Sequence, residues 1–236
     1  IVGYTALGGF FAASTTDFIQ SIVMTLALLI VVCFGIQTAG GISAVIDNAS
    51  QLAGYLSMTN VHDAVSGASG SYGIISIIST LAWGLGYFGM PHVLLRFMAI
   101  EDENKLSLSR RVATVWVTIS MAVAIFIGVI GYSMSKNGAI GVLSGADSET
   151  LLIQISQLLS KHGFIAIIPA GIILAGILAC TMSTADSQLL AASSSISQNI
   201  LKDVLHFKLS EKGTMIAARL TVIGIAIIAV FLAKDP

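Results

Sequence analysis

The sequence predicts an all-α polytopic membrane protein, and three observations support this prediction. Of the 236 residues, 56% are hydrophobic and only 10% are charged, whereas soluble domains carry about 25% charged residues. The mean hydropathy is +0.93. Apolar runs recur at about the length of a spanning helix, which is roughly 20 residues. The formal net charge of −1 gives no indication of nucleic acid as a partner.

Five apolar runs predict five membrane spans, here named A to E. They cover residues 18–35, 72–90, 112–134, 164–197 and 215–232. The first 12 residues have the composition of the tail of an earlier helix. The chain begins without methionine and stops directly after an apolar run, so we expect a fragment of a longer protein. We expect the whole chain to belong to one transmembrane domain.

The connections between the spans differ in basic residues, and this difference predicts their orientation. Lys and Arg are absent between spans A and B, number four between B and C, two between C and D, and three between D and E. Basic residues favour the cytoplasmic side of a membrane. We therefore expect the B–C and D–E connections in the cytoplasm.

Span D contains the unusually polar stretch "LACTMSTADSQLLAASSSISQN". On a helical wheel its small and hydroxylated residues share one face, and Asp186 flanks that face. Sodium is a hard cation that prefers oxygen ligands, by extension of the rule for Ca²⁺ and Mg²⁺. The hydroxyls of Ser183 and Thr184 and the carbonyl of Cys180 are therefore candidate ligands. The alternatives are that the serines serve helix packing and that Asp186 already lies in cytoplasmic water.

Asp17, in "STTDFIQ", is the second carboxylate near a span. It directly precedes an apolar run and follows two threonines, which is typical of a helix N-cap. An ionisable group near a span also indicates an ion path. The two interpretations are compatible, because a capping carboxylate can also face a passing ion.

Span B leads into "LAWGLGYFGMPHVLLRF", in which Trp83, Tyr87 and Pro91 are spaced four residues apart and form one stripe. Three glycines and Pro91 weaken the helix around this stripe. In a membrane, a weakened helix is tolerated where its backbone is buried or lines a cavity. The stripe therefore indicates either a pocket for a small amphiphilic solute or an aromatic belt that serves packing.

Enzymatic activity is not indicated by the sequence. The four histidines fall in connections or at span ends, and no metal-ligand spacing, Ser/His pair or phosphate loop is present. An intramembrane aspartyl protease needs two aspartates deep within spans, whereas Asp17 and Asp186 lie near the predicted cytoplasmic ends. We therefore expect a protein that is not an enzyme and uses no organic cofactor.

Three separated stretches, "GYTALGGFFAASTTDFIQ", "WGLGYFGMPHVLLRFMA" and "MSTADSQLLAASSSISQNI", resemble the sodium/solute symporter family in the same order along the chain. The "WGLGYFGMPH" block is most similar to the sodium/proline symporter branch. The resemblance implies a five-plus-five inverted repeat of the leucine-transporter type, in the cytoplasmic (inner) membrane. Spans A to E would then be core helices five to nine.

The resemblance also implies roles for individual residues. The main sodium site would take Ser183, Thr184 and the Cys180 carbonyl. In some members a second sodium site or exit route uses the aspartate that matches Asp17. Its hydroxyl positions match Ser183, Asp186 and Ser187, and here one of these is a carboxylate. Substrate contacts in the proline branch match Trp83, Tyr87 and Pro91.

The function that the resemblance implies is sodium-coupled symport of proline by alternating access. The implied partners are L-proline or a similar small solute, the lipid bilayer, and Na⁺ as the coupling ion. One alternative is symport of another solute, such as a different amino acid, a betaine-like osmolyte or a monocarboxylate. The others are a symporter-like membrane sensor and a packing bundle without transport.

Overall fold

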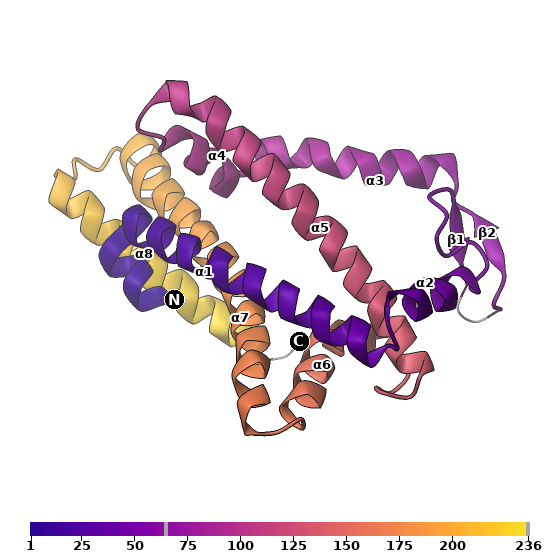
Figure 1. The fold of residues 1–236 in the computed structure, drawn as a ribbon. Helices are drawn as coiled ribbons and strands as arrows, with labels where there is room; N and C mark the ends of the chain where they lie inside the picture. The colour runs from indigo at the N-terminus through magenta and orange to yellow at the C-terminus, as the bar shows by residue number, and fades with distance from the viewer. Residues whose placement is uncertain (64–65, 235–236) are drawn as a thin grey trace. The chain divides into compact units, whose positions relative to one another are not determined.

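The computed structural model describes residues 1–63 and 66–234, and most of them are helical (Figure 1). The α-helices of these residues are α1 (Val2–Thr38), α2 (Ile42–Ser50), α3 (Ile74–Gly86), α4 (Pro91–Met98), α5 (Leu106–Lys136), α6 (Leu151–Ser160), α7 (Ile167–Ser194) and α8 (Glu211–Leu232). Two short strands, β1 (Asn60–His62) and β2 (Ser69–Ser71), pair antiparallel with Asn60 opposite Ser71.

The all-α membrane class is confirmed. Among the described residues, four helical stretches are long and apolar enough to cross a membrane, and α3 with α4 makes a fifth if the pair counts as one span. The four are Val2–Thr38, Glu103–Lys136, Phe164–Val204 and Glu211–Leu232. Spans A, C, D and E fall on these four in order. The inverted repeat stays a prediction.

Span B is interrupted where the glycines and Pro91 predict a weak helix. The 13 residues of α3 are about 20 Å long at 1.5 Å per residue, which is shorter than the roughly 30 Å of a bilayer core. A 3₁₀ turn, Tyr87–Gly89, follows α3, and Pro91 then stands in the first turn of α4. Proline is tolerated there because its missing N–H would have no helical partner.

Helix α1 is also interrupted, at Gly9, whose φ of 57° and ψ of −145° are not helical. This region is accessible almost only to glycine. Helix resumes directly after Gly9, so the predicted start of span A at residue 18 is wrong. The hydroxyls of Thr15 and Thr16 donate to the carbonyls of Phe11 and Ala12, at 2.9 and 3.0 Å, which satisfies them within the helix. Asp17 is therefore a mid-helix residue, and its interpretation as an N-cap is wrong.

The chain divides into two compact units. The first, here called the core unit, comprises Val23–Tyr87 and Asp102–Ile177. Its interior is built from large aliphatic side chains, and its buried cluster is Val31, Ala39, Val45, Ile127, Ile130, Met134, Ile140, Ile155, Leu159, Ala170 and Ile173. Helices approach closely where glycine allows it: a Cβ added at Gly35 would lie 2.6 Å from Ile130 Cγ2.

The residues between spans A and B are more structured than their polar composition suggests. Helix α2 and the β1–β2 hairpin occupy this segment, and α2 packs beside the C-terminal end of α5 (Figure 1). The Asn48 amide donates to the Ser133 hydroxyl at 2.7 Å, and the Asn137 amide donates to the Ala39 carbonyl at 2.6 Å. Side-chain amides therefore tie this connection to α5, and the hydrophobic pattern alone does not reveal such ties.

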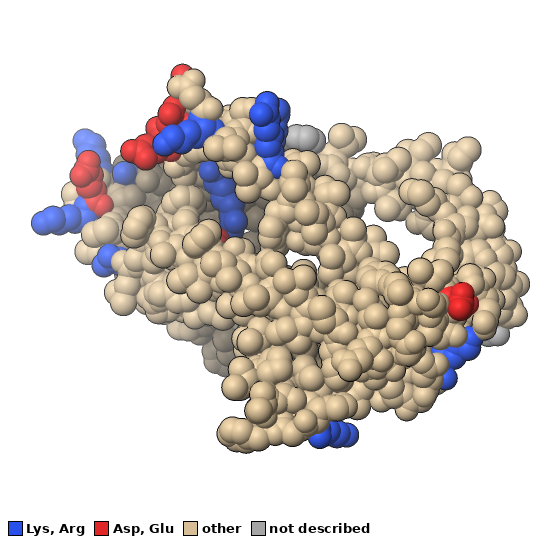
Figure 2. Space-filling model, viewed as in Figure 1, with Lys and Arg blue, Asp and Glu red and all other residues tan. Residues whose placement is uncertain are grey.

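The second unit, here called the polar unit, comprises Ile1–Ile22, Phe88–Glu101 and the described part of Leu178–Pro236. Its buried residues are small or polar: Thr5, Ala13, Ala179, Gln20, Asp186, Ser187, Ala191, Ser193, Ser197, Thr214 and Val222. Here α7 continues as a π-helix, Ser195–Val204, and the Ser210 hydroxyl caps α8 by accepting from the Gly213 N–H at 3.2 Å. Most of the molecular surface visible in Figure 2 carries no Lys, Arg, Asp or Glu side chain. A polar interior within apolar helices is where we place the candidate site.

Candidate ion-binding site

Asp186 lies in α7 with a relative exposure of 0%. The Tyr4 hydroxyl, from the short helical segment before Gly9, donates to Asp186 Oδ2 at 2.9 Å. The interpretation that Asp186 has reached cytoplasmic water is therefore wrong. The buried face of α7 includes Ala179, Asp186 and Ser193. It overlaps the predicted hydroxyl face at Ser187 and Ala191, which are also buried, and extends past the edge of that face to Asp186, which points into the polar unit.

Asp17, Arg96 and Ser187 form a second, connected group. One guanidinium nitrogen, Arg96 Nη2, donates to Asp17 Oδ2 and to the Ser187 hydroxyl, each at 2.6 Å. The Ser187 hydroxyl in turn donates to the Ser183 carbonyl at 2.9 Å. The Asp17 side chain is 15% exposed and that of Arg96 is 50% exposed. Three helices, α1, α4 and α7, thus contribute one polar group each.

Three oxygens in this unit lack a hydrogen-bond partner. Asp17 Oδ1, Gln20 Oε1 and Asp186 Oδ1 are the buried side-chain atoms without one, among the residues that the structure describes. Asp17 and Gln20 are three residues apart in α1 and share a face. Leaving a buried polar group unpaired costs about 1–3 kcal/mol, and more if it is charged. Such oxygens are the ligands that a hard cation prefers.

The charges of this group also favour a cation. Two carboxylates face one guanidinium, so the formal charge is −1 when all three groups are ionised. Asp186 directly precedes Ser187, whose hydroxyl shares Arg96 Nη2 with Asp17. An excess buried negative charge is costly unless it is compensated. A single monovalent cation would neutralise the group.

The space beside Asp17 limits what can bind there. A cavity of about 10 Å³ is lined by Asp17, Arg96, Ser187, His92 and Phe10, among others. One water needs about 10–15 Å³ on the same measure. The cavity therefore has room for about one water-sized occupant, which fits a bare cation and excludes a solute of the size of an amino acid.

The predicted main sodium ligands form a separate, local group in α7. The hydroxyls of Ser183 and Thr184 both donate to the Cys180 carbonyl, at 3.1 and 3.3 Å. Cys180 and Thr184 are exposed, and Ser183 is partly buried. Hydroxyls that donate to their own helix backbone keep their lone pairs as acceptors. The structure therefore brings Asp17, Asp186 and Ser187 together, and it leaves Cys180, Ser183 and Thr184 on a more exposed part of the same helix.

The predicted substrate residues lie on either side of the break in span B. Trp83 belongs to α3, Tyr87 begins the 3₁₀ turn, and Pro91 begins α4. The rings of Trp83 and Tyr87 meet edge to face with centroids 6.0 Å apart. Both side chains are exposed, at 77% and 52%. They present an aromatic surface beside a backbone that has left the helix.

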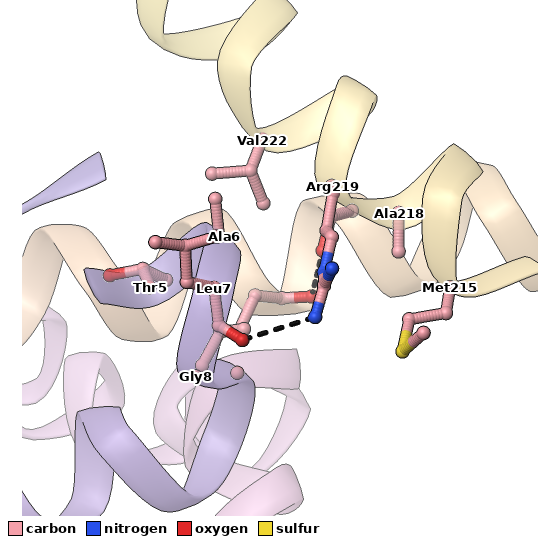
Figure 3. A pocket seen from close by; sticks show the side chains of 11 residues that line it. Thr5, Ala6, Leu7, Gly8, Met215, Ala218, Arg219 and Val222 are labelled. Carbon is pink, nitrogen blue, oxygen red and sulfur yellow. Dashed lines mark hydrogen bonds between the residues drawn. The ribbon is translucent and has the colours of Figure 1, made fainter. Parts of the chain in front are cut away.

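A pocket of about 210 Å³ lies in the polar unit beside the Gly9 break (Figure 3). Arg219 of α8 points into it and donates to the Leu7 carbonyl at 3.2 Å. The last carbonyls of a helix have no helical donor, and a cation near them is favourable. Arg219 therefore stabilises the end of the helical segment that carries Tyr4.

Comparison with known proteins identifies the family. The profile described as "Sodium:solute symporter family" matches residues 1–236, which is the whole chain.

The chain belongs to the sodium:solute symporter family.

Its curated relatives in this family are bacterial proteins. The chain is 36% identical to the "Osmoregulated proline transporter OpuE" of Bacillus subtilis, over 100% of this chain and 44% of the relative. It is 34% identical to the "Sodium/proline symporter" of Salmonella typhimurium, over 99% of this chain and 44% of the relative. The chain thus spans less than half the length of these relatives. No solved structure matches it. As a family member with several apolar helices, it is a multi-pass integral protein of the cytoplasmic membrane.

Sequence reasoning missed three residues of the polar group: Tyr4, Gln20 and Arg96. From the sequence, we treated Arg96 only as one of the basic residues of a predicted cytoplasmic connection. It lies among apolar residues, five positions after Pro91. Gln20 lies three residues after Asp17, and this helical spacing is the signal that could have found it. Tyr4 gives no such signal, because its contact with Asp186 joins residues 182 positions apart.

Proposed function

We propose that the full-length protein couples the inward movement of sodium to the uptake of proline or a similar small solute. The proposal rests on family membership, on relatives named as a proline transporter and a sodium/proline symporter, and on one structural observation. That observation is the pair of carboxylates in apolar helices, each with a buried oxygen that has no hydrogen-bond partner. Within a membrane, ionisable residues of this kind mark ion pathways.

Sodium binds at two places in this proposal. Ser183, Thr184 and the Cys180 carbonyl hold one ion, because three oxygens gather within about one helical turn without a full charge. Weak, reversible binding of this kind suits a transport cycle. Asp17, Asp186 and Ser187 form the second place. The formal charge and the unpaired carboxylate oxygens favour a single cation there, as does the water-sized cavity beside Asp17 and Ser187.

Proline binds at Trp83, Tyr87 and Pro91. The edge-to-face rings offer an apolar surface to the pyrrolidine ring. The residues between Gly86 and Pro91 have left the α-helix, which frees backbone groups for the solute's ammonium and carboxylate. The chain contributes these residues as part of one transmembrane domain of the five-plus-five type.

Coupling follows from differential affinity. Each ligand binds better when the other is present, and this effect is reciprocal. The membrane potential drives the cycle, since one charge that crosses the membrane gains about 2.3 kcal/mol per 100 mV. The protein acts as a transporter and performs no covalent chemistry.

Uptake of labelled proline tests this function. The full-length protein would be produced in cells that lack proline transport, and uptake measured with an inward sodium gradient and with choline in place of sodium. We expect gradient-dependent uptake that unlabelled proline abolishes. If the protein is present in the membrane and no uptake occurs, proline is not its solute. A competition panel of other amino acids, betaine-like osmolytes and monocarboxylates then separates the remaining solutes, and a lack of response to all of them favours a sensor.

A further inference from the structure

Arg96 occupies the position that a cation bound to both Asp17 Oδ2 and the Ser187 hydroxyl would need. Its Nη2 atom lies 2.6 Å from both Asp17 Oδ2 and the Ser187 hydroxyl oxygen. A metal ion bound to the same two oxygens would lie at nearly the same distance from them, since hard cations bind oxygen at about 2.0–2.6 Å. The guanidinium nitrogen and the ion therefore cannot occupy this position together.

The adjoining space does not resolve this conflict. The cavity beside Asp17 measures about 10 Å³, which is room for about one water and not for a displaced guanidinium. Arg96 must therefore leave when an ion binds to both oxygens. Its side chain is 50% exposed, so a solvated position is accessible to it. The guanidinium of Arg96 is a cation, so it competes with sodium for the same oxygens.

The helix that carries Arg96 is weakly held. None of the residues in α4, which spans only eight positions, is buried. Segments with few buried contacts are those that move most easily. Pro91, a predicted substrate contact, begins the same helix. Five residues at 1.5 Å each separate Pro91 from Arg96, or about 7.5 Å along the axis. A movement of α4 that accompanies the release of Arg96 therefore carries Pro91 with it.

We propose that Arg96 is a tethered cation that competes with sodium for Asp17 and Ser187, and that its displacement links sodium binding to the position of α4. This inference rests on the proposed function and adds a positioning residue to it. Without sodium, Arg96 neutralises Asp17 and holds α4 against α1 and α7. When sodium binds, Arg96 is released and Pro91 moves with α4. Asp186 keeps its bond with Tyr4 in both states.

The test is a sodium titration that does not require transport. The full-length protein and its Arg96→Gln variant would be purified, and their thermal unfolding followed from zero to high NaCl, with choline chloride holding ionic strength constant. Removal of a competitor lowers the apparent half-saturating concentration. We expect a decrease of about fivefold, as for an ion pair of ordinary strength. Arg96→Lys, which retains the cation, should stay within about twofold of wild type.

Two controls separate competition from general effects. Arg111→Gln removes a charge from an exposed arginine of α5 and should leave the half-saturating concentration unchanged. Ser187→Ala removes one of the two acceptors of Arg96 and should lower the sodium affinity, because it also removes an ion ligand. If Arg96→Gln does not fold, Arg96→Lys with Ser187→Ala still reports on the shared oxygens.

The outcomes are distinct from those of the uptake experiment. An unchanged or increased half-saturating sodium concentration in folded Arg96→Gln overturns the competition, as does the absence of any sodium effect on wild type. If sodium stabilises wild type, Arg96→Gln tightens its binding and no proline uptake occurs, then the inference stands and proline is the wrong solute. If uptake is sodium-dependent and Arg96→Gln has wild-type sodium affinity, then the function stands and the inference fails.

Discussion

Replacement of Asp186 by asparagine tests the second ion position most directly. Asn keeps the size of the side chain and an oxygen for the Tyr4 hydroxyl, which lies 2.9 Å from the carboxylate. It removes one unit of charge at a residue with 0% exposure. The variant therefore separates the charge of Asp186 from its packing.

The expected magnitude follows from Coulomb's law for an ion at contact distance from the carboxylate. Two opposite unit charges 4 Å apart interact by about 4 kcal/mol at an effective dielectric constant of 20. We assign about half of this to the dehydration of the ion, which leaves about 2 kcal/mol. Since about 1.4 kcal/mol corresponds to a factor of ten, the sodium affinity should fall by about thirtyfold.

The measurement is thermal unfolding of the purified full-length protein against sodium, since a bound ligand stabilises the folded state by RT ln(1 + [L]/Kd). We expect the half-saturating concentration to rise by about thirtyfold in Asp186→Asn. Without sodium, the variant should unfold at the wild-type temperature or above, because an uncompensated buried charge is gone. Ser195→Ala is the matched control, since the Ser195 hydroxyl donates only to the Ala191 carbonyl, at 3.0 Å.

Two results would refute this reasoning. A wild-type sodium titration in Asp186→Asn means that the carboxylate does not face the ion. A variant that unfolds several degrees below wild type without sodium means that the charge of Asp186 stabilises the fold through the Tyr4 hydrogen bond. In that case the buried oxygen has a structural role.

Three further predictions concern the neighbouring residues. Tyr4→Phe removes the hydroxyl that donates to Asp186 and should weaken sodium binding by about tenfold, or about 1.4 kcal/mol, in the same titration; an unchanged affinity would mean that the hydrogen bond does not orient the carboxylate. Ser183→Ala or Thr184→Ala should raise the sodium half-saturation of uptake about tenfold or more, with stability changed by less than about 0.5 kcal/mol, because each hydroxyl donates only to its own helix. Equal sodium curves in both variants would exclude this site. Trp83→Ala or Tyr87→Ala should raise the proline half-saturation by about tenfold at saturating sodium; normal proline kinetics in both would place the solute elsewhere.

The spans were predictable because their signal is local. A run of about 20 apolar residues can be satisfied only as a helix in a membrane. The break after Gly86 was predictable for the same reason, since glycine and proline act through their own backbone. The start of the helix that carries Asp17 was not predictable. Threonines whose hydroxyls donate to carbonyls of their own helix cannot be told from capping residues in the sequence.

The polar group was predictable only in part. Asp17, Asp186 and Ser187 stand out from their apolar neighbours, and the family resemblance places them together. Arg96 bonds Asp17 and Ser187, which lie 79 and 91 residues from it in the sequence. Periodicity within one helix cannot predict contacts between such distant residues. Helix α2 was missed because it is only nine residues long and buries few apolar side chains, Val45 and Ala49, while its Asn48 amide bonds Ser133 of α5.

The contrast between the two interiors has a consequence for how this sequence can diverge. The core unit is filled with interlocking aliphatic side chains, where the loss of a single large group costs about 2–5 kcal/mol. The polar unit is filled with small side chains, so an exchange among serine, alanine and aspartate changes little volume there. Natural selection can therefore change the ion-binding chemistry of the polar unit while the core unit keeps the fold stable. The carboxylate at position 186, where the family resemblance implies a hydroxyl, is a substitution of this kind. Libraries aimed at altered cation preference should accordingly be confined to the polar unit.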